Sequence, residues 1–279
     1  YSYNDRYFTE FNFGYNGSEN FKKGYRFGFF PSVALGWVIS NESFMQGMNP
    51  WLSFLKLRGS YGLVGNDNLG GRRFAYVSTV NWTGGYQWGY QGDYWRDGLV
   101  EGDFGIPDLT WETATKANVG AEIGLFSKFM LQVDLFKEHR KDIFMQRKTI
   151  PELAGFQQAP WANFGKVDNK GIDISATYDH QLTRDLALSF RGNFTFARNR
   201  IVEYDESDGI KNSPRSLTGH SLNKYYALIA DGLFSFDDFE DPDRGILKEG
   251  IPQHTFGEVR PGDIKYVDVN EDGRVDAFD

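Results

Sequence analysis

The sequence predicts an all-β fold, part of an antiparallel transmembrane β-barrel, and three observations lead to this prediction. First, apolar residues recur at every second position of long segments, with polar residues between them. Second, these segments run for roughly ten residues or more, which is the length that crosses a bilayer at the tilt of a barrel strand. Third, short turns and long links alternate between the segments, as they do in outer-membrane barrels.

The clearest segments lie between Thr110 and Glu203. The first two meet at Ser127-Lys128, a third follows the long link from Arg147 to Lys166, and a fourth follows the turn from His180 to Asp185. Their apolar positions are Ala117, Val119, Ala121, Ile123, Leu125; Phe129, Leu131, Val133, Leu135; Ile172, Ile174, Ala176, Tyr178; and Leu186, Leu188, Phe190, Phe194, Phe196. The alternate positions are too polar for a protein core, so an apolar phase outside the protein is expected to cover the first face.

The same alternation predicts strands over 7–15, 27–39 and 55–63. Pro31 lacks a backbone N–H and therefore predicts a local sheet edge or bulge. The stretch from Ser40 to Met45 predicts a helical turn with Ser40 or Asn41 as its N-cap. The segment 225–236 is a weaker apolar stretch that fits either an eighth spanning strand or an excursion above the membrane. The prediction is thus about seven to eight strands of a larger, plugged barrel with long extracellular loops.

Composition narrows the class of protein. A net charge of −8 and a pI near 5.1 make nucleic acid an unsuitable partner. The chain has no cysteine, which excludes disulfides, thiol catalysis and zinc-thiolate sites. A soluble β-sandwich also has alternating strands, but its strands are usually nearer five or six residues long, and it buries the face that here is polar.

The stretch from Gly65 to Leu109 lacks regular alternation and predicts a long loop. Glycines there are interleaved with aromatic residues and with charged residues such as Asp93 and Arg96. The aromatic candidates for a substrate or partner loop are Trp82, Tyr86, Trp88, Tyr90, Tyr94 and Trp95. Two interpretations stay open: the rings stack on sugars while charged groups bond the hydroxyls, or the rings pack on one another and hold the loop down.

The stretch 268–279 has the residue spacing of a calcium-binding loop. Oxygen-bearing side chains stand at its first, third, fifth, ninth and twelfth positions, and Gly273 stands where a sharp turn is needed. The candidate ligands are Asp268, Asn270, Asp272, Asp276 and Asp279, with the backbone carbonyl of Arg274. Calcium is the one cofactor suggested, and none is required. The alternative is an ion-free acidic turn organised by Asx hydrogen bonds.

No catalytic site is predicted. The histidines His139, His180, His220 and His254 are dispersed and form no metalloprotease spacing. No nucleophile elbow or phosphate-binding glycine loop is present either. The acidic run from Asp237 to Asp243 is typical of a solvated loop. The protein is therefore not expected to be an enzyme.

Several short motifs follow one another in an order that resembles the SusC/RagA class of TonB-dependent outer-membrane transporters of Bacteroidetes. They occupy residues 11–18, 28–40, 51–62, 65–66, 109–113, 169–171, 230–234 and 261–266. Among them are Phe11-Asn-Phe-Gly-Tyr-Asn-Gly-Ser18 and Pro261-Gly-Asp-Ile-Lys-Tyr266. Each string alone is weak evidence, but their order over nearly the whole chain is specific.

The resemblance implies a fragment of a plugged barrel of roughly 22 strands in the outer membrane of a Gram-negative bacterium. It implies import of nutrient oligosaccharides or peptides with a SusD-like surface lipoprotein, energised through TonB, ExbB and ExbD, whose contact regions lie outside this sequence. Residues 1–279 would then be one part of the barrel domain, 65–109 an extracellular loop and 204–279 an extracellular excursion ending in the calcium-like loop. Both chain ends look cut, which agrees with a fragment. The alternatives are a passive porin and a secreted calcium-binding β-sandwich that recognises glycans.

Overall fold

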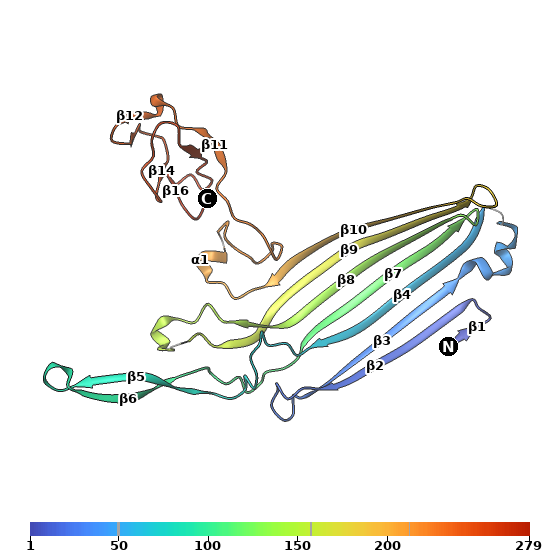
Figure 1. Ribbon diagram of the computed structural model, residues 1–279, viewed down its shortest axis with the longest axis horizontal. Helices are drawn as coiled ribbons and strands as arrows, with labels where there is room; N and C mark the ends of the chain where they lie inside the picture. The colour runs from blue at the N-terminus through green and yellow to red at the C-terminus, as the bar shows by residue number, and fades with distance from the viewer. Residues whose placement is uncertain (49–50, 157, 212) are drawn as a thin grey trace. The chain divides into compact units, whose positions relative to one another are not determined.

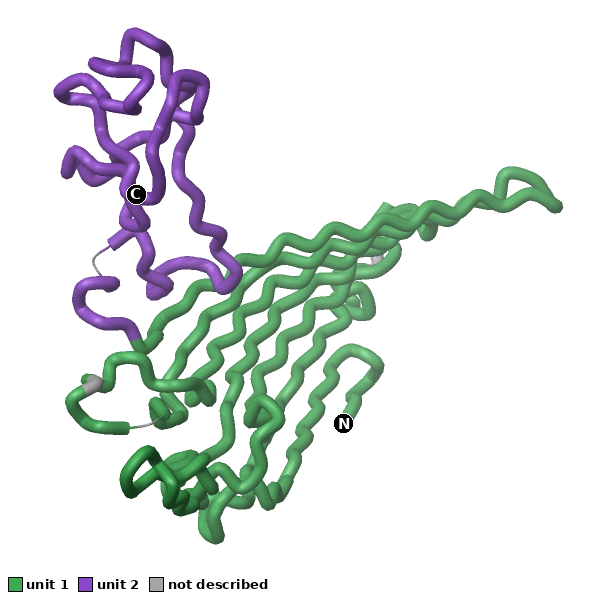
Figure 2. Tube along the Cα trace, turned by 60° about the vertical axis from the view of Figure 1, so that its left-hand side comes forward, with its two compact units in different colours: residues 1–205 green, residues 206–279 purple. Residues whose placement is uncertain are grey.

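The structure is a computed structural model that describes residues 1–48, 51–156, 158–211 and 213–279. The chain divides into two compact units, unit 1 (1–205) and unit 2 (206–279), which Figure 2 shows in different colours. Among the described residues, no helix is long and apolar enough to span a bilayer.

Unit 1 is built on one antiparallel sheet of eight strands in the order β1-β2-β3-β4-β7-β8-β9-β10. Neighbours in the sheet follow one another along the chain, and Figure 1 shows them side by side. The strands are β1 (Ser2–Tyr3), β2 (Tyr7–Gly17), β3 (Phe27–Val38), β4 (Leu52–Asn66), β7 (Glu112–Leu125), β8 (Phe129–Gln146), β9 (Trp161–Gln181) and β10 (Ala187–Glu203). The predicted all-β, antiparallel class is confirmed. The other sheets of the described residues have two strands each, so the sandwich alternative has no second sheet of matching size.

Short turns fix the register at one end of the sheet. Phe126 and Ser127 both have positive φ, 55° and 54°, and the N–H of Lys128 donates to the carbonyl of Leu125 at 3.1 Å. The turn therefore reverses the chain in three residues and places Leu125 opposite Phe129. From there the pairing runs without a shift to Thr113 and Lys141. Because side chains alternate across a strand, this unbroken register keeps the predicted apolar positions of both strands on one face.

The apolar face is the sheet face that carries the predicted apolar residues, and protein does not cover it. One cross-strand row of this face runs Leu35, Gly59, Val119, Leu135, Ile172, Phe196. Val119 is 64% exposed and Leu135 is 56% exposed. Exposed apolar side chains over so many strands form a surface far larger than a soluble monomer shows. The expectation that something other than this chain covers this face is consistent with the structure.

Three local predictions have definite outcomes. Pro31 lies in β3 where the pairing to β4 stops, because that pairing begins only at Ser32, so the predicted local edge is confirmed. The helical turn is also confirmed, as the 3-10 helices η1 (Ile39–Asn41) and η2 (Ser43–Met48). The predicted cap is wrong: Val38 is the N-cap of η1 and makes no side-chain cap bond. Asn41 instead lies inside η1 and donates its side-chain amide to the Asp5 carbonyl at 2.7 Å.

The long link between β4 and β7 contains secondary structure that the sequence did not predict. It forms a hairpin of β5 (Val80–Trp88) and β6 (Tyr94–Glu101), joined through the 3-10 helix η3 (Tyr90–Gly92). A register shift between Thr83 and Tyr86, at two glycines, explains why strict alternation is absent from the sequence. The link between β8 and β9 is shorter than predicted because β9 already begins at Trp161, and it contains η4 (Glu152–Ala154).

Unit 2 has short elements around a small core. They are α1 (Asp208–Lys211), β11 (Ala230–Leu233), η5 (Phe236–Asp238), β12 (Phe239–Asp241), β13 (Ile246–Leu247), β14 (Gln253–His254), β15 (Ile264–Tyr266) and β16 (Arg274–Val275). Its buried cluster comprises Phe234, Phe239, Leu247 and Val259. Within the stretch 225–236 only β11 is a strand, and it pairs with β15, not with β10. This stretch therefore does not extend the large sheet.

Candidate functional site

The face opposite the apolar face, called the polar face below, carries ion pairs that cross from strand to strand. Arg58 on β4 pairs with Glu122 on β7, at 3.4 Å, and with Asp134 on β8. Lys56 also pairs with Glu122, at 3.6 Å. All four side chains are partly shielded from solvent, between 17% and 39% exposed. Opposite charges on neighbouring strands stabilise the register of a sheet.

A glycine makes the ion pair between Arg58 and Asp134 possible. Gly120 lies between Arg58 and Asp134 in the cross-strand register, and a Cβ atom there would overlap the Asp134 carboxylate. The absent side chain lets the guanidinium reach over β7 to a strand that is not its neighbour. The polar face therefore has a path for Arg58 that any larger residue at position 120 would close.

A second ion-pair group lies closer to the long loops. Arg140 on β8 pairs with Glu138 at 2.9 Å and with Glu112 on β7 at 3.4 Å. Lys116 pairs with Glu138 at 3.7 Å. Together the two groups make the polar face hydrophilic along β4, β7 and β8. Such a face suits the interior of a large barrel and does not suit a protein core.

At the end of the sheet that carries the long loops, the β2–β3 link and both ends of the β4–β7 link pack into a small apolar core. The buried residues are Phe21 from the β2–β3 link, Leu69 from the segment after β4, and Ile106, Leu109 and Trp111 before β7. Phe21 and Leu109 are fully buried. The indole N–H of Trp111 donates to the carbonyl of Arg26 at 3.2 Å. This core holds the bases of the loops in fixed positions at the end of the sheet.

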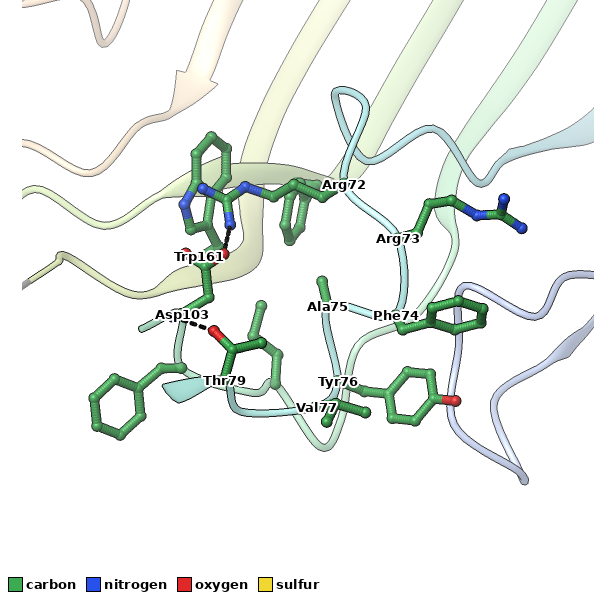
Figure 3. A pocket seen from close by; sticks show the side chains of 12 residues that line it. Arg72, Arg73, Phe74, Ala75, Tyr76, Val77, Thr79, Asp103 and Trp161 are labelled. Carbon is green, nitrogen blue, oxygen red and sulfur yellow. Dashed lines mark hydrogen bonds and ion pairs between the residues drawn. The ribbon is translucent and has the colours of Figure 1, made fainter. Parts of the chain in front are cut away.

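Beside this core is a cavity of about 440 Å³, shown in Figure 3. Trp161 and Phe144 stack at 4.9 Å between ring centroids, and the guanidinium of Arg72 lies 4.6 Å from the centre of a Trp161 ring. Arg72 also pairs with Asp103 at 2.7 Å. The indole nitrogen of Trp161 is buried without a hydrogen-bond partner. The cavity thus combines an aromatic wall with one charged pair, a combination suited to a small polar ligand.

No motif or residue spacing in the sequence predicts this cavity. Arg72 and Asp103 flank the β5–β6 hairpin, whereas Phe144 and Trp161 come from the facing ends of β8 and β9. No spacing rule joins residues from such distant segments, so only the folded chain brings them together. Trp161 lies within the link that the sequence predicts over 147–166, where nothing distinguishes it from other loop aromatics.

The six aromatic candidates of the long loop all lie on or next to the β5–β6 hairpin and are between 52% and 86% exposed. Register places Trp82 opposite Leu99 and Trp88 opposite Tyr94. Tyr86 and Trp88 are in ring contact, with centroids 5.9 Å apart, and the guanidinium of Arg96 lies 4.8 Å from the centre of the Tyr94 ring. The aromatic rings thus project from the two-stranded hairpin and are not buried against one another. Their role in binding stays a prediction.

Two acidic residues that follow one another in the sequence hold loops by hydrogen bonds, each within its own unit. Asp205, 4% exposed, accepts hydrogen bonds from the N–H groups of Lys148 and Thr149 and pairs with Arg147. Burial raises the pKa of the Asp205 carboxyl, but the bonds from these groups lower it more, so its pKa lies well below the usual range. Glu206 binds residues 216–218 in unit 2 in the same way, and its pKa is also lowered.

The calcium-like segment 268–279 folds into a closed loop. Asp268 accepts hydrogen bonds from the N–H groups of Gly273 at 2.7 Å and Asp272 at 3.2 Å, and Gly273 has a φ of 83°. The side-chain oxygens of the remaining predicted ligands also accept hydrogen bonds from nearby backbone N–H groups. Asn270 accepts from Asp272, Asp272 from Arg274, Asp276 from Phe278, and Asp279 from Val269 and Asp276. Within the described part of the chain, no three acidic or histidine side chains converge as a metal-binding group. The oxygen donors suit calcium chemically, but this arrangement is also that of an Asx-bonded turn, so the metal site stays a prediction.

Occupancy of this loop is tested by limited proteolysis of the protein in calcium and in excess chelator. If calcium binds, it neutralises the clustered carboxylates, and cleavage within 268–279 slows by about tenfold or more. Asp272→Ala removes that protection, whereas Asp237→Ala, an exposed acid of the same unit, keeps it. Equal cleavage rates of the wild type in calcium and in chelator would show that the loop is an ion-free turn.

Unit 2 also contains a half-buried histidine among aromatic rings. The His254 ring lies 4.9 Å from that of Phe256 and 5.4 Å from those of Phe234 and Tyr266. Burial lowers the pKa of His254, and the nearby Asp263 raises it by less. The folded unit therefore favours the neutral imidazole.

Because the unfolded chain binds the proton more readily, unit 2 is expected to lose stability as pH falls through about 6.5, the pKa of an unperturbed histidine. The measurement is amide hydrogen exchange of residues 230–275 at pH 7.5 and pH 5.5. His254→Phe keeps the ring packing and is expected to remove the difference, whereas His220→Phe, at an exposed histidine, is expected to retain it. Identical protection of the wild type at both pH values would contradict the prediction.

Comparison with known proteins gives one family for almost the whole chain. A family model described as TonB dependent receptor-like, beta-barrel matches residues 1–277. TonB-dependent receptor P3 of Formosa agariphila is 27% identical over 286 residues, covering 100% of this chain and 27% of that protein. TonB-dependent receptor SusC of Bacteroides thetaiotaomicron is 27% identical over 285 residues, with the same coverage of each chain. The chain thus spans about a quarter of the length of the curated relatives that it matches.

Solved structures show the same fold. The RagAB peptide importer in its closed-closed state matches 82% of this chain and 24% of the solved chain, with a TM-score of 0.66 and 25% identity. The RagAB peptide transporter matches 86% of this chain and 25% of the solved chain, with a TM-score of 0.67 and 24% identity. The resemblance that the ordered motifs predicted is confirmed.

Proposed function

The chain belongs to the TonB-dependent receptor β-barrel family, and from this premise we propose that it forms part of an outer-membrane transporter that imports nutrient oligosaccharides or peptides. A SusD-like surface lipoprotein is the proposed partner on the outside of the cell. TonB, with ExbB and ExbD, is the proposed energy source. The relatives named above are transport proteins and not enzymes, in line with the lack of a catalytic motif in the sequence.

The observation that carries this proposal is the difference between the two faces of the large sheet. On the apolar face, Leu135 is 56% exposed, whereas on the polar face Arg58 bridges β4, β7 and β8 through ion pairs. Contact with lipid would cover the apolar face, and a water-filled lumen would solvate the polar face. A soluble protein would need the reverse arrangement.

The long-loop end is the proposed entrance for substrate. Its loop core fixes the base of the β5–β6 hairpin, whose exposed tryptophan and tyrosine side chains suit contact with sugar rings or with a protein surface. The Arg72–Asp103 pair in the adjacent cavity supplies hydrogen-bonding groups. The name SusC states no substrate, while the RagAB structures are those of a peptide importer.

Uptake by the native bacterium tests the proposal. The gene that encodes this chain is deleted, and accumulation of labelled oligosaccharide pools and labelled peptide pools is compared with that of the parent. Loss of uptake of one pool, restored by the gene but not in a strain without TonB, is the expected result. Uptake that persists without TonB but needs the gene would indicate a passive porin, and unchanged uptake of both pools would refute the proposed function.

A further inference from the structure

Basic side chains form a cluster on the apolar face, where the alternating apolar residues of β8, β9 and β10 end. Lys137 on β8 lies directly opposite Lys170 on β9, which in turn lies opposite Arg198 on β10. Arg200 is the next residue of β10 on the same face. All four side chains are exposed. Because like charges directly opposite each other destabilise a sheet, an anion bound to this row would offset that cost.

The chain itself does not supply that anion. Among the described residues, no acidic side chain lies within ion-pair distance of Lys137, Lys170 or Arg198. Two acids at the ends of these strands have other partners: Asp168, which lies opposite Arg200, pairs with His139, and Glu203 pairs with Lys166 at 2.6 Å. The polar face is different, because there the cations of β4, β7 and β8 described above are all matched by carboxylates. The cluster is thus a feature of the lipid-facing side alone.

Position along the strand places the cluster at the membrane boundary. On β8 the outward side chains are Phe129, Leu131, Val133 and Leu135, and Lys137 follows directly. Phe129 and Lys137 are separated by about 27 Å along the strand, or about 20 Å along the bilayer normal at a barrel's usual tilt. An apolar band about 25 Å tall therefore ends close to Lys137. Arg198 shows the same transition, since its guanidinium lies 5.4 Å from the centre of the Phe196 ring.

From these observations we propose that Lys137, Lys170, Arg198 and Arg200 bind the phosphate groups of an anionic lipid headgroup in the leaflet on the long-loop side. The surface is continuous with the lipid-facing band, so a membrane lipid reaches it without leaving the bilayer. Phosphate is the complementary anion for both residue types, as a point charge for lysine and as a forked hydrogen-bond acceptor for arginine. The proposal rests on the proposed function for its orientation, which makes this the outer leaflet, where the phosphate-bearing lipid of a Gram-negative bacterium is lipopolysaccharide.

The test uses the complete detergent-solubilised transporter and a fluorescent lipopolysaccharide. Lys137→Gln, Lys170→Gln and Arg198→Gln are combined in one variant. Because each cation near an anionic surface contributes about fivefold to binding, affinity is expected to fall by roughly a hundredfold. The control combines Lys22→Gln, Lys23→Gln and Arg184→Gln, which removes the same charge from exposed link and turn residues and is expected to change affinity by less than threefold.

Two further arms identify what is bound. Lipopolysaccharide without its lipid A phosphates is expected to bind the wild type and the triple variant equally weakly, and millimolar inorganic phosphate is expected not to displace the intact lipid. Equal affinity of the triple variant and the wild type would overturn the proposal. So would loss of a co-purifying protein with lipid binding unchanged, which would assign the cluster to a protein partner. A heat-sensitive electrophoretic mobility of each variant checks that the barrel is folded, so either outcome is separate from failure of the proposed transport function.

Discussion

Val133→Arg is expected to destabilise the transporter by about 2–4 kcal/mol, because it places a charged side chain near the middle of the lipid-facing band. Val133 lies on β8, in the cross-strand row of Ala121, Ile174 and Phe194 on the apolar face. In lipid the guanidinium has no water and no acidic partner on this face. The measurement is the free energy of unfolding of the complete protein in lipid vesicles, obtained by denaturant titration.

The neighbouring residue is a matched control. Gln132 lies on the polar face, opposite Glu122 on β7. Gln132→Arg introduces the same side chain one position away but directs it toward a carboxylate and water, so a change of less than about 1 kcal/mol is expected. If the two variants lose equal stability, the assignment of the two faces is wrong.

Asp205→Asn is expected to cost about 2–4 kcal/mol of the stability of the β8–β9 link, because it removes a buried charge that holds one guanidinium and two backbone N–H groups. The substituted amide keeps a single acceptor oxygen and leaves Arg147 without its carboxylate. Protease cleavage within residues 147–160 measures the effect. Glu203→Gln is the control, because the Glu203–Lys166 pair is about 40% exposed and solvent screens it, so its loss is expected to change cleavage little.

The same carboxylate gives a pH dependence of known sign. Its pKa is lowered in the folded protein, so its stabilising contribution is complete above about pH 3.9, the value of an unperturbed aspartate, and is lost as the pH falls further. Cleavage of the 147–160 link by an acid protease is thus expected to rise between pH 4 and pH 2 in the wild type. In Asp205→Asn it is expected to be high at both values. A flat wild-type profile would contradict this account of Asp205.

Much of the large sheet was predictable because a single physical constraint acts along each strand. Lipid on one side and water on the other impose a period of two, and this period marks strands such as 129–135 directly in the sequence. Strand ends were less accurate. β8 continues to Gln146 and β9 begins at Trp161, because beyond the bilayer both faces are wet and the alternation no longer has to hold.

The loops depend on contacts that sequence spacing does not encode. The hairpin β5–β6 was missed because its register shift breaks the alternation, and the cap of η1 was misassigned because Asn41 bonds a distant carbonyl instead. The cavity beside Trp161 draws residues from separate links. The calcium-like loop is the reverse case, because the sequence shows its spacing clearly. Its hydrogen bonds from backbone N–H groups to side-chain oxygens, however, fit both a calcium site and an ion-free turn.

We propose that this chain is part of a barrel embedded in the outer membrane. Its most direct test is fractionation of the native bacterium with an antibody raised against residues 205–224, recording both the compartment and the apparent chain length. We expect a band about four times as long as this chain, found in the outer membrane, whose electrophoretic mobility changes on heating. A soluble or secreted band that needs no detergent would contradict it.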